Sequence, residues 1–163
     1  MRPLTLATVV PLLTACAGDC PAPTDLLEGQ VQGTMDSAAW LAEGVGWTVA
    51  SGALSINVDR TDGYTLSMVL RVASDSLLVE DLISSGEAPF EVPLGDGEDG
   101  NWINVYVQGA TSTYSTIQGS GGTLTVAEID GEVLLGCLDF GAATSDGESL
   151  LFEGGRFKVG PRD

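Results

Sequence analysis

The sequence has no histidine and a single lysine, Lys158, and these shortages exclude several kinds of function. Without histidine the chain cannot form a Ser-His-Asp triad, a histidine-ligated zinc site or a histidine pH switch. Lysine and arginine total 6 against 23 acidic residues, a formal net charge of −17. We therefore expect no nucleic-acid partner and no electrostatic attraction to anionic lipid. Adaptation to high salt is an alternative explanation for the acidity.

Motifs for common catalytic chemistry are also missing. The chain contains no Gly-x-Ser-x-Gly elbow, phosphate-binding loop or dinucleotide fingerprint. Hydrolysis by two carboxylates needs a pair of acids about 5–10 Å apart in a cleft, and 23 acids make no pair stand out. We expect a protein that is not an enzyme, with a carboxylate hydrolase as the weakest of the competing hypotheses.

The N-terminus has the pattern of an export signal. Arg2 precedes an apolar stretch over residues 4–13, which is too short to span a bilayer, and small residues follow it. Leu13-Thr14-Ala15-Cys16 resembles the bacterial lipobox. That resemblance implies cleavage before Cys16, a diacylglyceryl group on its sulfur and acylation of the new amine. Ala17, rather than aspartate, at the next position favours the outer membrane in this kind of lipoprotein. The alternative is an ordinary signal peptide with a cysteine nearby.

These features divide the chain into three parts. We expect a cleaved signal peptide over residues 1–15, a lipidated cysteine and tether over 16–28, and a single domain over 29–163. Pro21 and Pro23 would stiffen the tether. The membrane would then be a partner through the lipid anchor, and the domain would lie in the cell envelope.

Two further cysteines, Cys20 and Cys137, remain after the lipobox cysteine. In an exported protein two such cysteines most simply form a disulfide. The alternative is two unpaired thiols. A catalytic cysteine is disfavoured, because the chain has no histidine to activate it.

Alternation of apolar and polar residues predicts strands through most of the mature chain. With 22 glycines in the whole chain, these strands are expected to be short and joined by glycine turns. We expect an all-β fold, an antiparallel sandwich or barrel of about eight or nine short strands, with at most one short helix, over residues 74–83. Ten segments are candidates for these strands: residues 30–34, 47–50, 53–59, 64–72, 90–92, 101–107, 123–129, 132–140, 150–152 and 156–159.

The C-terminal third also carries a resemblance. The segments Gly122-Thr-Leu-Thr-Val126, Gly136-x-Leu-x-Phe140 and Gly154-Gly-Arg-Phe157 are similar to motifs of a family of uncharacterised bacterial lipoproteins with a β-sandwich-like domain. In that family a Gly-x-Phe-x-Phe strand is followed by a Gly-x-Phe strand that ends the domain, and this chain departs from the first of these motifs by having Leu138 where the family commonly has phenylalanine. The resemblance implies a fold and a location, but no activity and no functional residue.

Two segments are candidate binding sites. The acidic loop has hard oxygen ligands suited to Ca²⁺, although its spacing does not match an EF-hand, and a solvated turn is the alternative; its residues are Asp96, Glu98, Asp99 and Asn101. Trp102, Asn104 and Tyr106 alternate with apolar residues. On an open sheet face they would stack on a sugar ring and bond its hydroxyls, whereas on a covered face they would only pack.

The sequence thus favours a membrane-anchored envelope lipoprotein that acts as a structural or interaction module. The alternative is a module that binds glycan or Ca²⁺, and the partner would be an unknown envelope protein or a glycan.

Overall fold

A computed structural model describes residues 20–59, 63–95 and 100–162 of the chain. It contains 11 strands and one short helix, α1 (Val79–Ser85), so the expected all-β fold with at most one helix is confirmed. The strands in chain order are β1 (Gln30–Met35), β2 (Ala38–Ala42), β3 (Gly46–Ala50), β4 (Ala53–Asp59), β5 (Tyr64–Leu70), β6 (Phe90–Leu94), β7 (Trp102–Val107), β8 (Thr113–Ser115), β9 (Gly121–Asp130), β10 (Val133–Ala143) and β11 (Ser149–Pro161).

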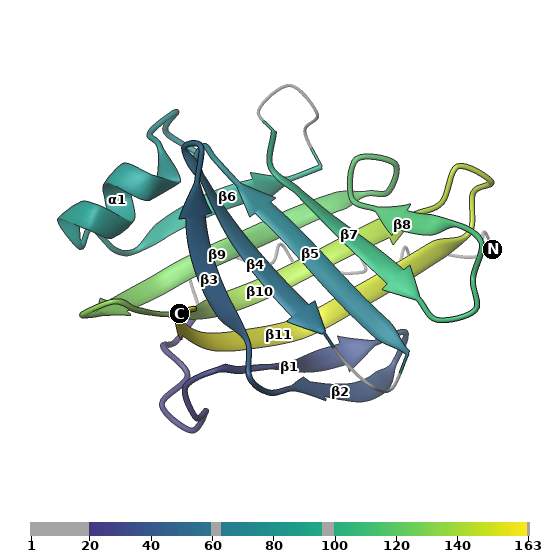
Figure 1. Ribbon diagram of the computed structural model, residues 1–163, viewed down its shortest axis with the longest axis horizontal. Coiled ribbons are helices and arrows are strands. Elements are labelled where there is room, and N and C mark those ends of the chain that lie inside the picture. Colours follow the sequence, from purple (N-terminus) through teal and green to yellow (C-terminus); the bar gives the residue numbers. More distant parts are fainter. Residues whose placement is uncertain (1–19, 60–62, 96–99, 163) are drawn as a thin grey trace, which may run out of the picture.

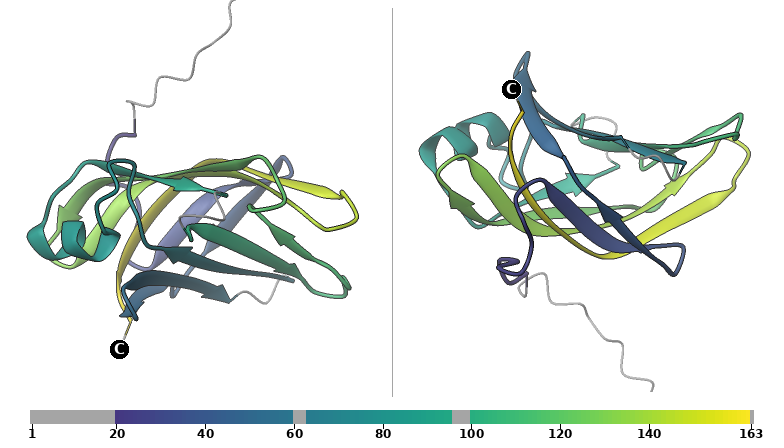
Figure 2. Two further views of the ribbon diagram at one scale, coloured as in Figure 1. Left: turned by 90° about the horizontal axis from the view of Figure 1, so that it is seen from above. Right: turned by 60° about the horizontal axis from the view of Figure 1, so that its bottom comes forward.

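The strands form two layers that share their corners (Figures 1 and 2). All 11 strands belong to one hydrogen-bonded sheet, which folds so that the first layer has the order β2-β1-β11-β10-β9-β6 and the second has the order β3-β4-β5-β7-β8. β11 joins them at one corner by pairing with β3, and β10 joins them at the other through Ala143 and Ser115. The apolar side chains of both layers meet in one core, as expected for a sandwich.

One pairing departs from the antiparallel arrangement that the sequence predicted. β11 runs parallel to β3 at Gly160–Gly46 and Pro161–Trp47, so the sheet is mixed. Every other pairing among the named strands is antiparallel. The parallel contact is two residues long because the end of β11 reaches the second layer only at its corner.

Two of the 11 strands, β2 and β8, lie outside the ranges that the sequence predicted. β1 and β2 are joined by Asp36 and Ser37, whose φ angles of 47° and 68° lie in the left-handed region that glycine or asparagine usually signals. The Asp36 carboxylate accepts a hydrogen bond from the Leu151 backbone N–H at 2.8 Å, which holds this turn against β11. β8 has only three residues and no full alternation to recognise.

β11 is one strand of 13 residues where two short strands were expected. Gly154 and Gly155 interrupt the apolar alternation, and the pairing registers with β10 and β1 both shift beside them. Gly154 has a φ of 59°, and the space of a Gly155 side chain is taken by the Leu138 carbonyl and the Phe152 ring. The glycines therefore form a bulge that bends the strand without ending it.

Phe152 lies at the centre of the core. Its ring meets Trp40 edge-on at 5.5 Å between centroids and stacks on Phe140 at 5.3 Å. Gly33 leaves room for it, because a Cβ there would lie 2.6 Å from the Phe152 Cζ atom. Val79 of α1 is fully buried in the same core, so the helix closes one end of the sandwich.

The segment before β1 lies on the outer face of the first layer. Cys20 forms a disulfide with Cys137 of β10, as the sequence predicted, and Pro23 and Leu26 are buried. The tether expected over residues 16–28 is therefore packed on the domain from Cys20 onward. Residues 16–19 and the expected signal peptide lie outside the described residues.

The disulfide closes a long loop, and its removal is expected to destabilise the fold. The cysteines are 117 residues apart, so in the chain-entropy model their bond contributes about 4–5 kcal/mol to the free energy of unfolding. Urea unfolding of the wild-type protein should shift to lower urea when a reductant is added. The double variant Cys20→Ala/Cys137→Ala should already unfold at lower urea and should not respond to reductant. Equal midpoints for the oxidised and reduced wild-type protein would contradict this.

Candidate binding surfaces

The N-terminal segment is fastened to the outer face of the first layer at two points. One is the disulfide to Cys137. The other is a paired contact from the Arg156 guanidinium to the Asp25 carboxylate, with N–O distances of 2.8 and 3.1 Å. This contact lowers the pKa of Asp25 below its usual value, mainly through the hydrogen bond from Arg156. The described part of the segment therefore lies against this face.

A broad groove crosses the same face. It has a volume of about 1350 Å³, and Cys137 on β10, Thr125 on β9 and Arg156 on β11 line it. The loop before α1 contributes Asp75 and Leu77. The groove combines small polar, acidic and apolar side chains, so its lining does not select one class of ligand.

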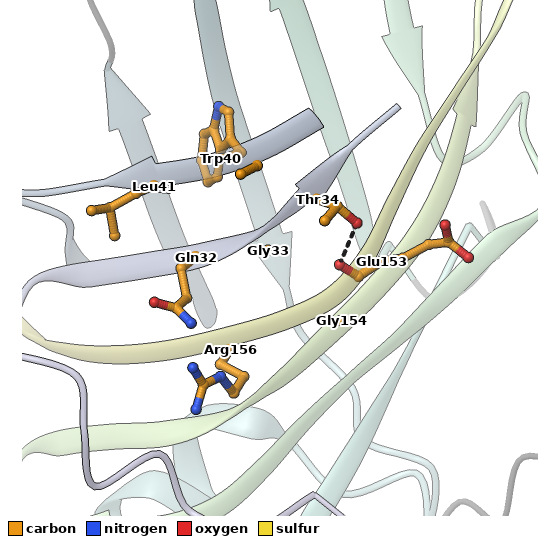
Figure 3. Close-up of a pocket in the computed structure, with 9 residues that line it drawn as sticks. Gln32, Gly33, Thr34, Trp40, Leu41, Glu153, Gly154 and Arg156 are labelled. Carbon is orange, nitrogen blue, oxygen red and sulfur yellow. Dashed lines mark hydrogen bonds between the residues drawn. The ribbon is translucent and has the colours of Figure 1, made fainter. Parts of the chain in front are cut away.

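A shallower hollow of about 710 Å³ lies beside it, across β2, β1 and β11 (Figure 3). Figure 3 shows the side chains of Gln32 and Arg156 pointing toward each other, while Trp40 points to the opposite side of the sheet from Leu41. The Thr34 hydroxyl donates a hydrogen bond to the Glu153 carbonyl at 3.1 Å across this hollow. Arg156 lines both depressions, and its contact with Asp25 directs it to the N-terminal segment.

The three residues proposed for a sugar site share the outer face of the second layer. Ile103 and Val105 of β7 are buried in the core, so Trp102, Asn104 and Tyr106 point the other way. Trp102 and Asn104 are half-buried and Tyr106 is 45% exposed. The structure thus brings this predicted group together on one face.

The strand register adds neighbours that the sequence analysis missed. Asn104 lies opposite Ser67 on β5 and Ser115 on β8, and Asn57 on β4 lies opposite Ser67. The Ser67 hydroxyl donates a hydrogen bond to the Asn57 side-chain oxygen at 3.0 Å. The signal for these residues is the polar half of the alternation in each strand, but only the register places them in one row.

Asn101 is the one candidate ligand of the acidic loop that the structure describes. It is fully buried, and its side-chain oxygen accepts hydrogen bonds from the backbone N–H groups of Arg71 and Val72 at 2.7 and 3.1 Å. Its amide nitrogen donates to the Val72 carbonyl at 2.6 Å. Both lone pairs of the oxygen are used, so Asn101 joins β7 to the end of β5 and offers no ligand atom to a cation. Asp96, Glu98 and Asp99 lie outside the described residues.

Within the described ranges, no group of three or more acidic or cysteine side chains is arranged to hold a metal ion. No helix in the same ranges is both long enough and apolar enough to cross a membrane.

Tyr114 has a raised pKa because its hydroxyl donates a hydrogen bond to Glu148, which links β8 to the turn between β10 and β11. That pair connects two parts of the fold and does not lie in either depression.

Comparison with known proteins gives no relative: the chain matches no protein-family model, and no curated protein or solved structure matches it. The resemblance to uncharacterised lipoproteins stays a prediction.

Replacement of Asn101 by alanine is expected to destabilise the protein by about 2–4 kcal/mol, because it leaves buried backbone groups of residues 71–72 without partners. Asn104→Ala is the matched control, since the same change on the half-buried outer face should alter the free energy of unfolding by only about 0.5 kcal/mol. Urea denaturation of both variants measures the difference. Equal losses would show that the Asn101 bonds contribute little.

The Asp25–Arg156 contact predicts a dependence of stability on pH. Because the pKa of Asp25 is lowered in the folded state, its contribution is present above the ordinary value of 3.8 and is lost as the pH falls through the lowered pKa. The difference in urea midpoint between wild type and Asp25→Asn should therefore be largest near pH 7 and vanish in strong acid. Asp146→Asn removes the same charge from an exposed turn and is the matched control at pH 7, where it should shift the urea midpoint less than Asp25→Asn does.

Proposed function

We propose that this chain is an exported lipoprotein, held at a membrane by lipid on Cys16, that acts as a non-enzymatic interaction module of the cell envelope. The disulfide between Cys20 and Cys137 carries the proposal, because disulfides persist in oxidising compartments outside the cytoplasm. The lipobox-like segment before Cys16 and the absence of histidine support it further.

The position of the disulfide supports a specific attachment. Cys20 follows Cys16 by four residues, a reach of at most about 14 Å when extended. A lipid on Cys16 would therefore hold the membrane close to the outer face of the first layer, where Cys20 meets β10. The outer face of the second layer would then point away from the bilayer (Figure 2).

A role in binding agrees with the surfaces. The fold offers two wide depressions on one face and an aromatic face on the other, with a single core between the two faces.

The anchor itself needs more than one acyl chain. One acyl chain has a low affinity for a bilayer, so firm anchoring requires a second chain, which the lipobox chemistry supplies.

Two cysteines four residues apart permit a sharp test of the anchor. Cys16→Ala should release the protein from membranes and abolish the acyl mass on intact mass spectrometry, because the acceptor sulfur is lost. Cys20→Ala is the matched control, which should lose the disulfide but keep both the lipid and the membrane association. Native protein that retains residues 1–15 and carries no added hydrocarbon would refute the proposal.

A further inference from the structure

We infer that the outer face of β4, β5, β7 and β8 binds a neutral glycan, with Trp102 and Tyr106 stacking on sugar rings and Asn104 bonding hydroxyls between them. This inference rests on the proposed function, since it gives the interaction module a class of ligand. It is carried by the arrangement of side chains that the strand register brings together.

The face is organised in rows that cross the strands. The central row is polar and consists of Asn57, Ser67, Asn104 and Ser115. The row on one side contains Ser55, Val69 and Trp102, and the row on the other contains Asp59, Thr65, Tyr106 and Thr113. Trp102 and Tyr106 are four residues apart on β7, about 13 Å along the strand. That span suits a short oligosaccharide and exceeds a single sugar ring.

The chemistry of the face is unusual for this chain. The whole chain has a formal net charge of −17, yet the outward positions of these four strands hold one charged residue, Asp59, at the β4 end of the Tyr106 row; the others are Ser55, Asn57, Thr65, Ser67, Val69, Trp102, Asn104, Tyr106, Thr113 and Ser115. Arg71 lies beyond the Trp102 end, against Gly100. Hydroxyl and amide groups between aromatic rings complement a neutral, hydroxyl-rich ligand, whereas an ionic partner would find no opposite charge in the central row.

The face is also available to a ligand. Figure 1 shows β4, β5 and β7 in front of the first layer, with α1 at one end of the sandwich and not across these strands. Among the described residues, the side chain of Asn104 makes no hydrogen bond, so its donors and acceptor remain for a partner. Attachment through the first layer would leave this face directed away from the membrane.

The inference is tested with the full chain purified in detergent. Particles of cellulose, xylan, mannan and β-1,3-glucan are used to pull down the protein, and the matching oligosaccharides are titrated by tryptophan fluorescence. We expect at least one of these polymers to bind, and both Trp102→Ala and Tyr106→Ala to weaken its binding by about tenfold or more. Leu151→Ala is the matched control, because Leu151 is also 45% exposed but belongs to β11.

Thermal unfolding of every variant checks that a loss of binding does not reflect a loss of fold. The variant Trp102→Phe keeps an aromatic ring, so it should bind the polymer more tightly than Trp102→Ala does. The inference would be overturned if none of the four polymers binds, or if neither aromatic variant weakens the binding that is seen. Binding confined to charged polymers such as heparin would do the same. A chain that carries lipid on Cys16 but does not bind neutral glycans would refute this inference alone, and the proposed function would not be affected.

Discussion

The fold depends on β11, which belongs to both layers. Its 13 residues pair with β10 along one edge and with β1 and then β3 along the other. Such a strand must change direction between the layers, and the bulge at Gly154 and Gly155 makes this possible. Without the bend, Phe152 could not lie in the shared core while Gly160 reaches β3, so the core and the corner are set by the same two glycines.

The sequence predicted most of the strands because alternation is a local signal. The bounds of β4 were predicted as the structure has them. The misses occur where the backbone departs from the usual residue preferences. Asp36 and Ser37 adopt a left-handed turn without glycine, whereas Gly154 and Gly155 were interpreted as a break and instead continue one strand.

The candidate site shows the same limit. The outward direction of Trp102, Asn104 and Tyr106 follows from the burial of the residues between them, so a sequence pattern is sufficient. Their neighbours are set by pairing between β5 and β7, which are separated by α1 and β6 along the chain, and no local pattern encodes that register. Asn101 was misplaced because it lies at the start of the strand, where alternation does not show whether a side chain faces solvent or the backbone of a neighbour.

The disulfide at Cys20 also has a mechanical consequence. If the chain is pulled from its N-terminal side while the rest of the domain is held, tension enters the fold through Cys137 in β10, an interior strand with β9 and β11 on either side. Shearing an interior strand requires many hydrogen bonds to break together, whereas a pull on β1 would peel its pairs in succession. The covalent bond therefore diverts force away from the strand that would otherwise unzip first.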